Sequence, residues 1–115
     1  MIKIVSMLKR KEGITLQEFS DHWFKHGPLS LREIPQDVQS ICRRYAQNHA
    51  IKLGDGAEPL YDGIAESCFD DLKGVRKWSD FYFSDAGKVL REDEESFMDK
   101  SKRIIVVTEE KVIIP

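Results

Sequence analysis

The sequence predicts an α+β fold in which two helices cover one face of a four-stranded antiparallel sheet. Three observations support this prediction: the order of the expected elements, a helix signal that ends in paired histidines, and an alternating segment followed by a turn. The order is strand, helix, strand, strand, helix, strand, which is the split βαβ pattern of the ferredoxin-like fold. The 115 residues are expected to form a single domain, 1–115.

The first strand and the first helix have clear local signals. Residues 1–8 are mostly apolar and predict a strand. Thr15 and Glu18 have the spacing of a capping box, which satisfies two free amides where a helix begins. The Gly-Pro pair directly after His26 predicts that this helix ends there. Under this prediction His26 lies at the helix C-terminus, beside the apolar stripe that packs on the sheet.

Alternation, turn residues and helix caps predict the remaining elements. Residues 41–53 alternate as a strand does, which places Tyr45 and His49 on the same face. The other expected elements are a turn at 54–59, a strand at 61–69, a helix capped by Asp70 or Asp71, a further helix from Ser84 or Asp85, and a last strand at 103–112.

Composition argues against several functional classes. The chain has 18 basic and 20 acidic residues and a formal charge of -2, so no electrostatic attraction to nucleic acid or anionic membranes is expected. No apolar segment approaches the roughly 20 residues that cross a bilayer. The N-terminus lacks a secretory signal, and the two cysteines form neither a disulfide framework nor a zinc pattern. We therefore expect a cytoplasmic protein.

The last strand predicts a partner. Residues 104–107 are apolar on both sides, as is much of 1–8, and such strands are usually buried on both faces. Because the helices cover only one face, a second copy of the chain is the expected cover for the other, giving a homodimer. The alternative is a chain with one moderately apolar, exposed face.

Several short motifs occur in order along the chain. They are Met1-Ile-Lys-Ile-Val, Phe19-x-x-His-Trp-x-x-His-Gly-Pro-Leu29, Arg44-Tyr-x-Gln-Asn-His49, Tyr61-Asp-Gly-Ile-Ala-Glu66, Phe69-Asp-Asp71, Ser84-Asp-x-Gly87 and Asp93-x-x-x-Phe97-x-Asp99. With them the chain resembles the EthD family of the dimeric α+β barrel superfamily over nearly its whole length. The resemblance implies that two chains pair their sheets into a barrel, and that each protomer has a small-molecule pocket between its sheet and its helices.

The activities that the resemblance implies are diverse. The namesake is associated with bacterial degradation of ethyl tert-butyl ether beside a cytochrome P450 system, and the family is often described as oxidoreductase. A related branch isomerises methylmuconolactones, and fungal relatives dehydrate polyketide intermediates. The lactone isomerases share the histidine at His26, but their reactive cysteine falls at Ser67. Because Cys68 should face the other way in a strand, we do not expect the same thiol chemistry here.

Three residues are candidates for catalysis. Imidazole titrates near neutral pH, so His26 can take up and release a proton during a reaction. The alternative is that His26 merely caps its helix. Tyr45 could polarise a substrate oxygen and His49 could assist in proton transfer; the alternatives are a core tyrosine and a solvent-exposed hairpin histidine.

Other residues are candidates for ligand binding. They are His22, Trp23, Ser67, Trp78 and Phe97. His22 and His26 have a spacing that can hold a metal ion if a third ligand such as His49 joins them. Since no carboxylate in the motif plainly points to that edge, we expect neither a metal nor a cofactor.

Two groups of acidic residues are expected to be structural. Glu66 should pair with Arg43 or Arg44 across the hairpin; if it faced the pocket instead, it could act as a base. The acidic run at 92–95 is typical of a solvated helix face.

These observations together favour a homodimeric small-molecule enzyme. It would carry out cofactor-free proton transfer, as an isomerase, dehydratase or oxidoreductase, on an apolar carbonyl, phenolic or lactone-like molecule. The alternative is a non-catalytic dimeric accessory protein that binds a metabolite for a degradation pathway.

Overall fold

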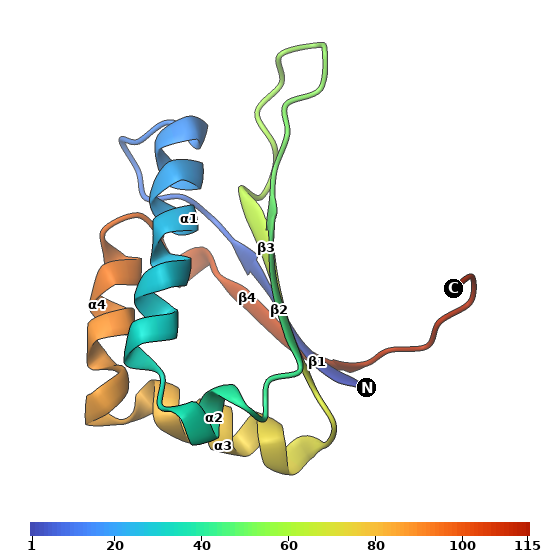
Figure 1. Ribbon diagram of the computed structural model, residues 1–115. Coiled ribbons are helices and arrows are strands. Elements are labelled where there is room, and N and C mark those ends of the chain that lie inside the picture. Colours follow the sequence, from blue (N-terminus) through green and yellow to red (C-terminus); the bar gives the residue numbers. More distant parts are fainter.

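The computed structural model describes residues 1–115 and contains one antiparallel sheet with all its helices on one side (Figure 1). The elements are β1 (Ile2–Leu8), α1 (Leu16–Glu33), α2 (Gln36–Gln39), β2 (Arg44–His49), β3 (Gly63–Phe69), α3 (Leu72–Phe83), α4 (Lys88–Glu95) and β4 (Ile104–Glu109), with short 3-10 turns at Asp85–Gly87 and Lys100–Lys102. The strand order β2-β3-β1-β4, with antiparallel neighbours throughout, confirms the predicted ferredoxin-like fold.

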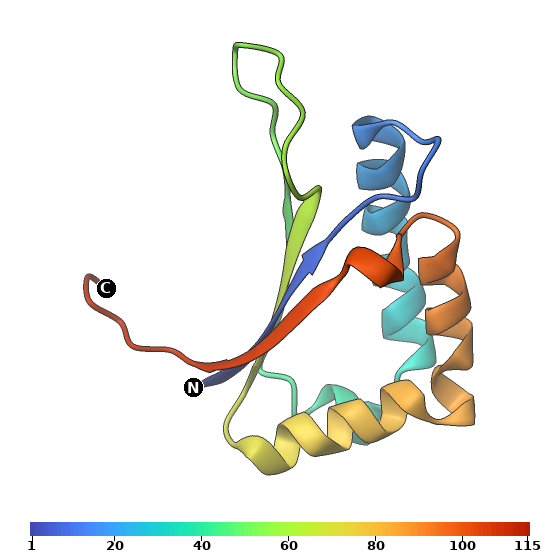
Figure 2. The same cartoon turned by 180° about the vertical axis from the view of Figure 1, so that it is seen from behind.

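The register of the strands decides which side chains face the helices. Ile4 lies opposite Ser67, and Ser6 lies opposite Ala65, in the pairing of β1 with β3. These four residues line a cavity on the helix side. Glu66, between them in sequence, therefore points to the outer face. Figure 2 shows from behind that the outer face has no helix over it.

Glu66 does not pair as expected. Its carboxylate lies 3.7 Å from Lys3 Nζ and accepts a hydrogen bond from Asn48 at 3.3 Å. Arg43 instead forms an ion pair with Asp70 at 2.6 Å. The prediction of an Arg43 or Arg44 partner is wrong because Lys3, on the neighbouring strand β1, lies on the same outer face.

Two apolar clusters join the helices to one another and to the sheet. The first consists of Leu8, Phe19, Trp23, Phe97 and Met98, and the second of Ile34, Val38, Phe81 and Leu90. Members of both clusters line the same cavity, so the cavity lies between the two parts of the core.

The Asp62-Gly63 pair fixes the start of β3 beneath α1. A Cβ atom on Gly63 would lie 2.3 Å from Cζ3 of Trp23, so only glycine lets the indole pack this closely. Asp62 is fully buried and accepts a hydrogen bond from the backbone amide of Arg10 at 2.7 Å. The pair therefore determines how far Trp23 approaches the sheet.

Helix α1 is longer than the sequence predicts. The capping box at Thr15 and Glu18 forms, but the helix continues through Pro28 to Glu33 instead of ending at His26. Proline removes one amide donor from the helix. Bonds from outside the helical ladder support this region: Gln47 donates to the Trp23 carbonyl at 2.9 Å, and the Ser30 hydroxyl donates to the His26 carbonyl at 2.8 Å. His26 is thus an interior helix residue and does not cap a helix end.

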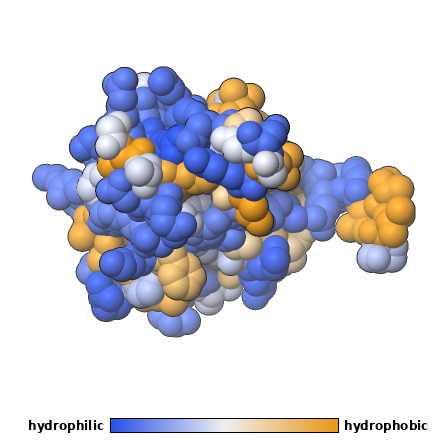
Figure 3. Space-filling model, turned by 90° about the horizontal axis from the view of Figure 1, so that it is seen from above, coloured by the Kyte–Doolittle hydropathy of each residue, from blue (hydrophilic) through white to orange (hydrophobic).

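The edge strand and the C-terminal tail leave apolar surface exposed. The four residues Ile104–Val107 of β4 are 41% to 51% exposed. Beyond β4, residues Val112, Ile113 and Ile114 are also exposed, and Figure 3 shows this tail standing apart from the body of the molecule. No helix of the structure has the length and apolar character needed to cross a membrane.

Candidate active site

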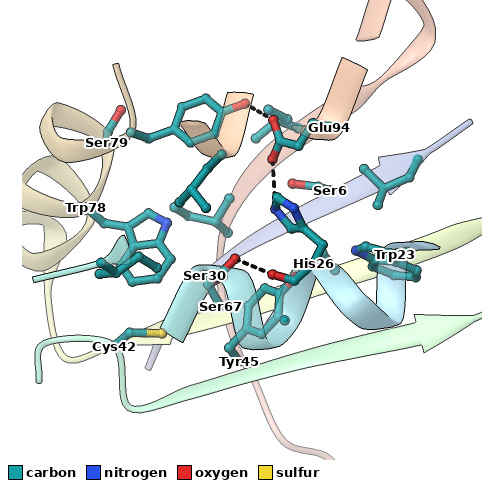
Figure 4. Close-up of a pocket in the computed structure, with 18 of the residues that line it drawn as sticks. Ser6, Trp23, His26, Ser30, Cys42, Tyr45, Ser67, Trp78, Ser79 and Glu94 are labelled. Carbon is teal, nitrogen blue, oxygen red and sulfur yellow. Dashed lines mark hydrogen bonds and ion pairs between the residues drawn. The ribbon is translucent and has the colours of Figure 1, made fainter. Parts of the chain in front are cut away.

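A cavity of about 570 Å³ lies between the helix side of the sheet and helices α1, α3 and α4 (Figure 4). Of its 25 lining residues 14 are hydrophobic, which makes it a suitable site for a small, largely apolar molecule. Trp23, Trp78, Leu90, Met98 and Ile105 supply much of the apolar wall. Polar residues also line the cavity, and His26, Glu94 and Tyr82 lie together at one end, which we call its polar end.

His26 is held from behind by a carboxylate of α4. The residue is 6% exposed, and its Nδ1 lies 2.6 Å from Oδ2 of Asp93. Burial alone would raise the pKa of Asp93, but hydrogen bonds from His22 and His26 outweigh it and hold that pKa below its usual value. Because the ionised carboxylate can only accept, we assign the proton to Nδ1 of His26. In neutral His26, Nε2 then presents its lone pair on the cavity side.

Glu94 faces His26 across the polar end of the cavity. Its Oε2 is 3.7 Å from Nε2 of His26, which is too long for a direct hydrogen bond. Both atoms can therefore contact one group of a bound molecule. Oε1 is held by the Tyr82 hydroxyl, by Lys100 Nζ at 3.1 Å and by Arg103 Nη1 at 3.6 Å. These contacts keep the Glu94 carboxylate in place.

The two tyrosines of the cavity are neutral hydrogen-bond donors at neutral pH. Desolvation, together with the charge of Glu94, raises the pKa of Tyr82 to about 12. Tyr45 exposes 43% of its surface, but its side chain reaches from β2 toward α1 along the cavity wall (Figure 4), and desolvation raises its pKa as well. The Tyr82 hydroxyl already donates to Glu94, whereas the Tyr45 hydroxyl can donate to a ligand oxygen.

The structure brings five of the eight residues expected at the site into the cavity wall. These are His26, Tyr45, Trp23, Ser67 and Trp78. Ser67 points inward while Cys68 does not line the cavity, as the alternation of a strand requires.

His22 and Phe97 lie behind the cavity instead of in its wall. Both line a separate, shallower groove on the other side of α1 and α4. His22 donates to Asp93 Oδ1 at 3.0 Å, so one carboxylate joins both histidines of the motif. Phe97 is fully buried, and its ring contacts both imidazoles at centroid distances of 4.6 and 5.7 Å.

His49 lies outside the cavity. It shares a sheet face with Tyr45, as expected, but the Trp23 ring packs against it at 4.5 Å on the cavity side. Its Nδ1 lies 2.6 Å from the Ser20 hydroxyl and its Nε2 lies 2.8 Å from Gln47 Oε1. Desolvation lowers the pKa of His49. In this structure His49 connects β2 to α1.

Asp93 and Glu94 were not expected at the site. The run 92–95 predicts a solvated face, yet the side chains of these two residues are only 25% and 12% exposed. The signal that could have revealed them is spacing: Leu90 and Phe97 are seven positions apart and buried, and the two carboxylates fall between them at helical intervals. No group of three or more histidine, cysteine or acidic side chains is arranged to hold a metal ion.

Comparison with known proteins identifies the family. The EthD domain matches residues 11–101 of the chain, which is most of its length. The chain belongs to the EthD domain family. No curated protein matches this EthD chain at a significant level.

Solved structures share the fold of this EthD domain. An EthD family protein from Bacillus halodurans is 23% identical, with a TM-score of 0.66 over 96% of this chain and 99% of that one. A dimeric ferredoxin-like protein of unknown function from Bacteroides fragilis is 13% identical, with a TM-score of 0.61 over 94% of each chain. The hydroxynitrile lyase of Passiflora edulis is 12% identical, with a TM-score of 0.58 over 99% of this chain and 96% of that one.

Proposed function

We propose that this EthD-domain protein is an enzyme that transfers a proton within a small, largely apolar carbonyl, phenolic or lactone-like molecule. The observation that supports this most strongly is the bond from His26 Nδ1 to Asp93, which leaves Nε2 free on the cavity side. A histidine oriented by a carboxylate is a general base whose second nitrogen is available to substrate. Isomerisation, dehydration and cofactor-free oxidation can all begin with this step.

In the proposed mechanism, His26 Nε2 removes a proton from the carbon next to a carbonyl group. The electron pair of the broken C–H bond moves to the carbonyl oxygen and forms an enolate. Tyr45, neutral at this pH, donates a hydrogen bond to that oxygen and stabilises its charge. The imidazolium, stabilised by Asp93, then returns the proton to the same or another carbon. Glu94 opposite His26 contributes negative charge that stabilises the imidazolium.

A second part of the proposal is that the protein works as a homodimer. The outer face of the sheet has no helix over it, and β4 leaves apolar side chains exposed at its edge. Ferredoxin-like proteins of the same fold from Bacteroides fragilis and Thermobifida fusca are described as dimeric. Pairing the two outer faces would remove this apolar surface from water.

Hydrogen–deuterium exchange tests the proposed chemistry. The protein is incubated with 2-tetralone in D₂O, and the loss of the proton signals next to the carbonyl is followed by NMR. Wild type should exchange them faster than buffer does, and His26→Gln should lose this activity. His49→Gln is the matched control, because His49 lies outside the cavity. If wild type binds 2-tetralone without accelerating exchange, the catalytic proposal is wrong and the protein is a binding module.

A further inference from the structure

The sheet side of the cavity contains two serine hydroxyl groups that bond no group of the chain. Ser67, on β3, is 6% exposed, and Ser6, on β1, is partly buried; both line the cavity. Figure 4 shows them on the sheet side, with no hydrogen bond drawn to either. Ser30, a third serine of the cavity, differs because its hydroxyl already donates to the His26 carbonyl at 2.8 Å.

The register places these two serines on the same face of the sheet, on adjacent strands. Ser67 lies opposite Ile4, and Ser6 lies opposite Ala65, so the serines are diagonal neighbours on adjacent strands. Diagonal neighbours on one sheet face lie roughly 7–8 Å apart, so both hydroxyl groups border the same part of the cavity floor. Ala65 beside them is small and leaves the floor open. On the other side of β3, Tyr45 lies directly opposite Ser67.

We propose that Ser6 and Ser67 form a second oxygen-binding subsite in the cavity. Both hydroxyl groups line the cavity with no partner from the chain, so a ligand oxygen placed there gains hydrogen bonds without breaking any within the protein. The preferred ligand is then a flat, apolar molecule with two oxygen functions, one at His26 and the other at the sheet floor. A neutral hydroxyl or carbonyl oxygen suits the subsite, because neither serine supplies charge.

This inference rests on the proposed function, since it uses the same cavity, but it concerns binding and not turnover. Hydroxyl groups placed to hydrogen-bond a ligand discriminate strongly against an analogue that lacks the matching oxygen. We therefore expect the subsite to set ligand preference, while His26 sets the rate of proton transfer.

Calorimetric titration with matched ligands tests the subsite. The probes are 2-naphthol, which has one oxygen, and 2,6- and 2,7-dihydroxynaphthalene, which have two. Wild type should bind at least one of the diols roughly tenfold more tightly than 2-naphthol, which is the worth of one good hydrogen bond. The double variant Ser6→Ala/Ser67→Ala should lose this preference and keep its affinity for 2-naphthol. Ser30→Ala, whose hydroxyl is already engaged, should retain the preference.

Several outcomes would overturn the subsite: no preference for either diol in wild type, a preference that survives in the double variant, or no binding of any probe. The exchange assay with 2-tetralone separates this result from the proposed function. If wild type catalyses exchange but shows no diol preference, the subsite alone is contradicted. A serine-dependent diol preference without catalysed exchange supports the subsite and contradicts the enzymatic proposal alone.

Discussion

Asp93 accepts a hydrogen bond from Nδ1 of His26 at 2.6 Å, although the two residues are 67 positions apart. The bond joins α4 to the middle of α1 and fixes the ring of His26 at the cavity wall. Because the same carboxylate also accepts from His22 at 3.0 Å, its orientation is held on both sides. The basic nitrogen that faces the cavity therefore depends on a residue outside it.

Replacing that carboxylate should impair catalysis more than folding. Asp93→Asn keeps the shape but no longer favours the Nδ1–H tautomer or the imidazolium of His26. The rate of 2-tetralone exchange should fall roughly 10²- to 10⁴-fold, which is the range for losing an oriented general base. Thermal unfolding checks that the variant is folded. Glu92→Gln, an exposed neighbour on the same helix, is the control, and equal rates for Asp93→Asn and Glu92→Gln would contradict the proposal.

Asp93 also predicts how the stability of the protein depends on pH. The pKa of Asp93 lies below its ordinary value of 3.8, because the two histidine bonds outweigh the opposing desolvation. The ionised Asp93 carboxylate therefore stabilises the fold fully above pH 3.8, and this stabilisation is lost as the pH falls through the lower pKa that Asp93 has in the folded protein. The difference in melting temperature between wild type and Asp93→Asn should shrink as the pH is lowered from about 5 to about 2.5. A constant difference would show that the ionised form has no special role.

The lowered pKa of His49 predicts a second dependence of stability on pH, at higher pH and with a different cause. Desolvation lowers its pKa from 6.5, so folding favours the neutral ring. The stability that the neutral His49 ring contributes should be complete above pH 6.5. It should fall as the pH drops below that value, because the histidine of the unfolded chain takes up a proton first. Between about pH 7.5 and pH 5.5, wild type should lose more thermal stability than His49→Gln. Equal losses measured by calorimetry would contradict this account.

The close contact of Gly63 with Trp23 predicts that adding one methyl group at position 63 strongly destabilises the fold. Gly63→Ala should destabilise the protein by about 1–3 kcal/mol, since the indole must move to admit the new atom. Gly54→Ala is the control, because a Cβ atom there meets nothing within 4 Å. Urea unfolding of both variants measures the difference. Equal stabilities would mean that Trp23 is not held tightly against β3.

The proposed dimer predicts a charge-sensitive outer face. Val106 lies opposite Val5 in the sheet, on the face away from the cavity. Val106→Lys should convert a dimer to a monomer, because a lysine buried between two sheets lacks a partner. Leu72→Lys, at an exposed position that begins α3, should not change the mass. Light scattering after size-exclusion chromatography measures both, and a monomeric wild type would contradict the dimer.

Local signals in the sequence predicted much of the fold. The caps at Thr15 and Asp71 depend only on residues within one helical turn, and both form. Strand order follows from the order of elements once the split pattern is seen. The predicted helix end at His26 was wrong: α1 continues through Pro28 to Glu33, and side-chain bonds from Gln47 of β2 and from Ser30 to carbonyl groups near the proline support this part of the helix.

The site was harder to predict because it depends on contacts between distant elements. Alternation placed Tyr45 and His49 on one face, but sequence does not show that Trp23 stands between His49 and the cavity. Asp93 and Glu94 look like surface residues in an acidic run, and only their place between Leu90 and Phe97 turns them inward.

The measurement that tests the central claim most directly is the tautomer of His26, determined from its side-chain ¹⁵N chemical shifts by long-range ¹H–¹⁵N NMR above neutral pH. We predict a protonated Nδ1 and an unprotonated Nε2, and we predict that 2-naphthol shifts the Nε2 resonance. A proton on Nε2, or an Nε2 resonance that a saturating concentration of 2-naphthol leaves unchanged, would contradict the account.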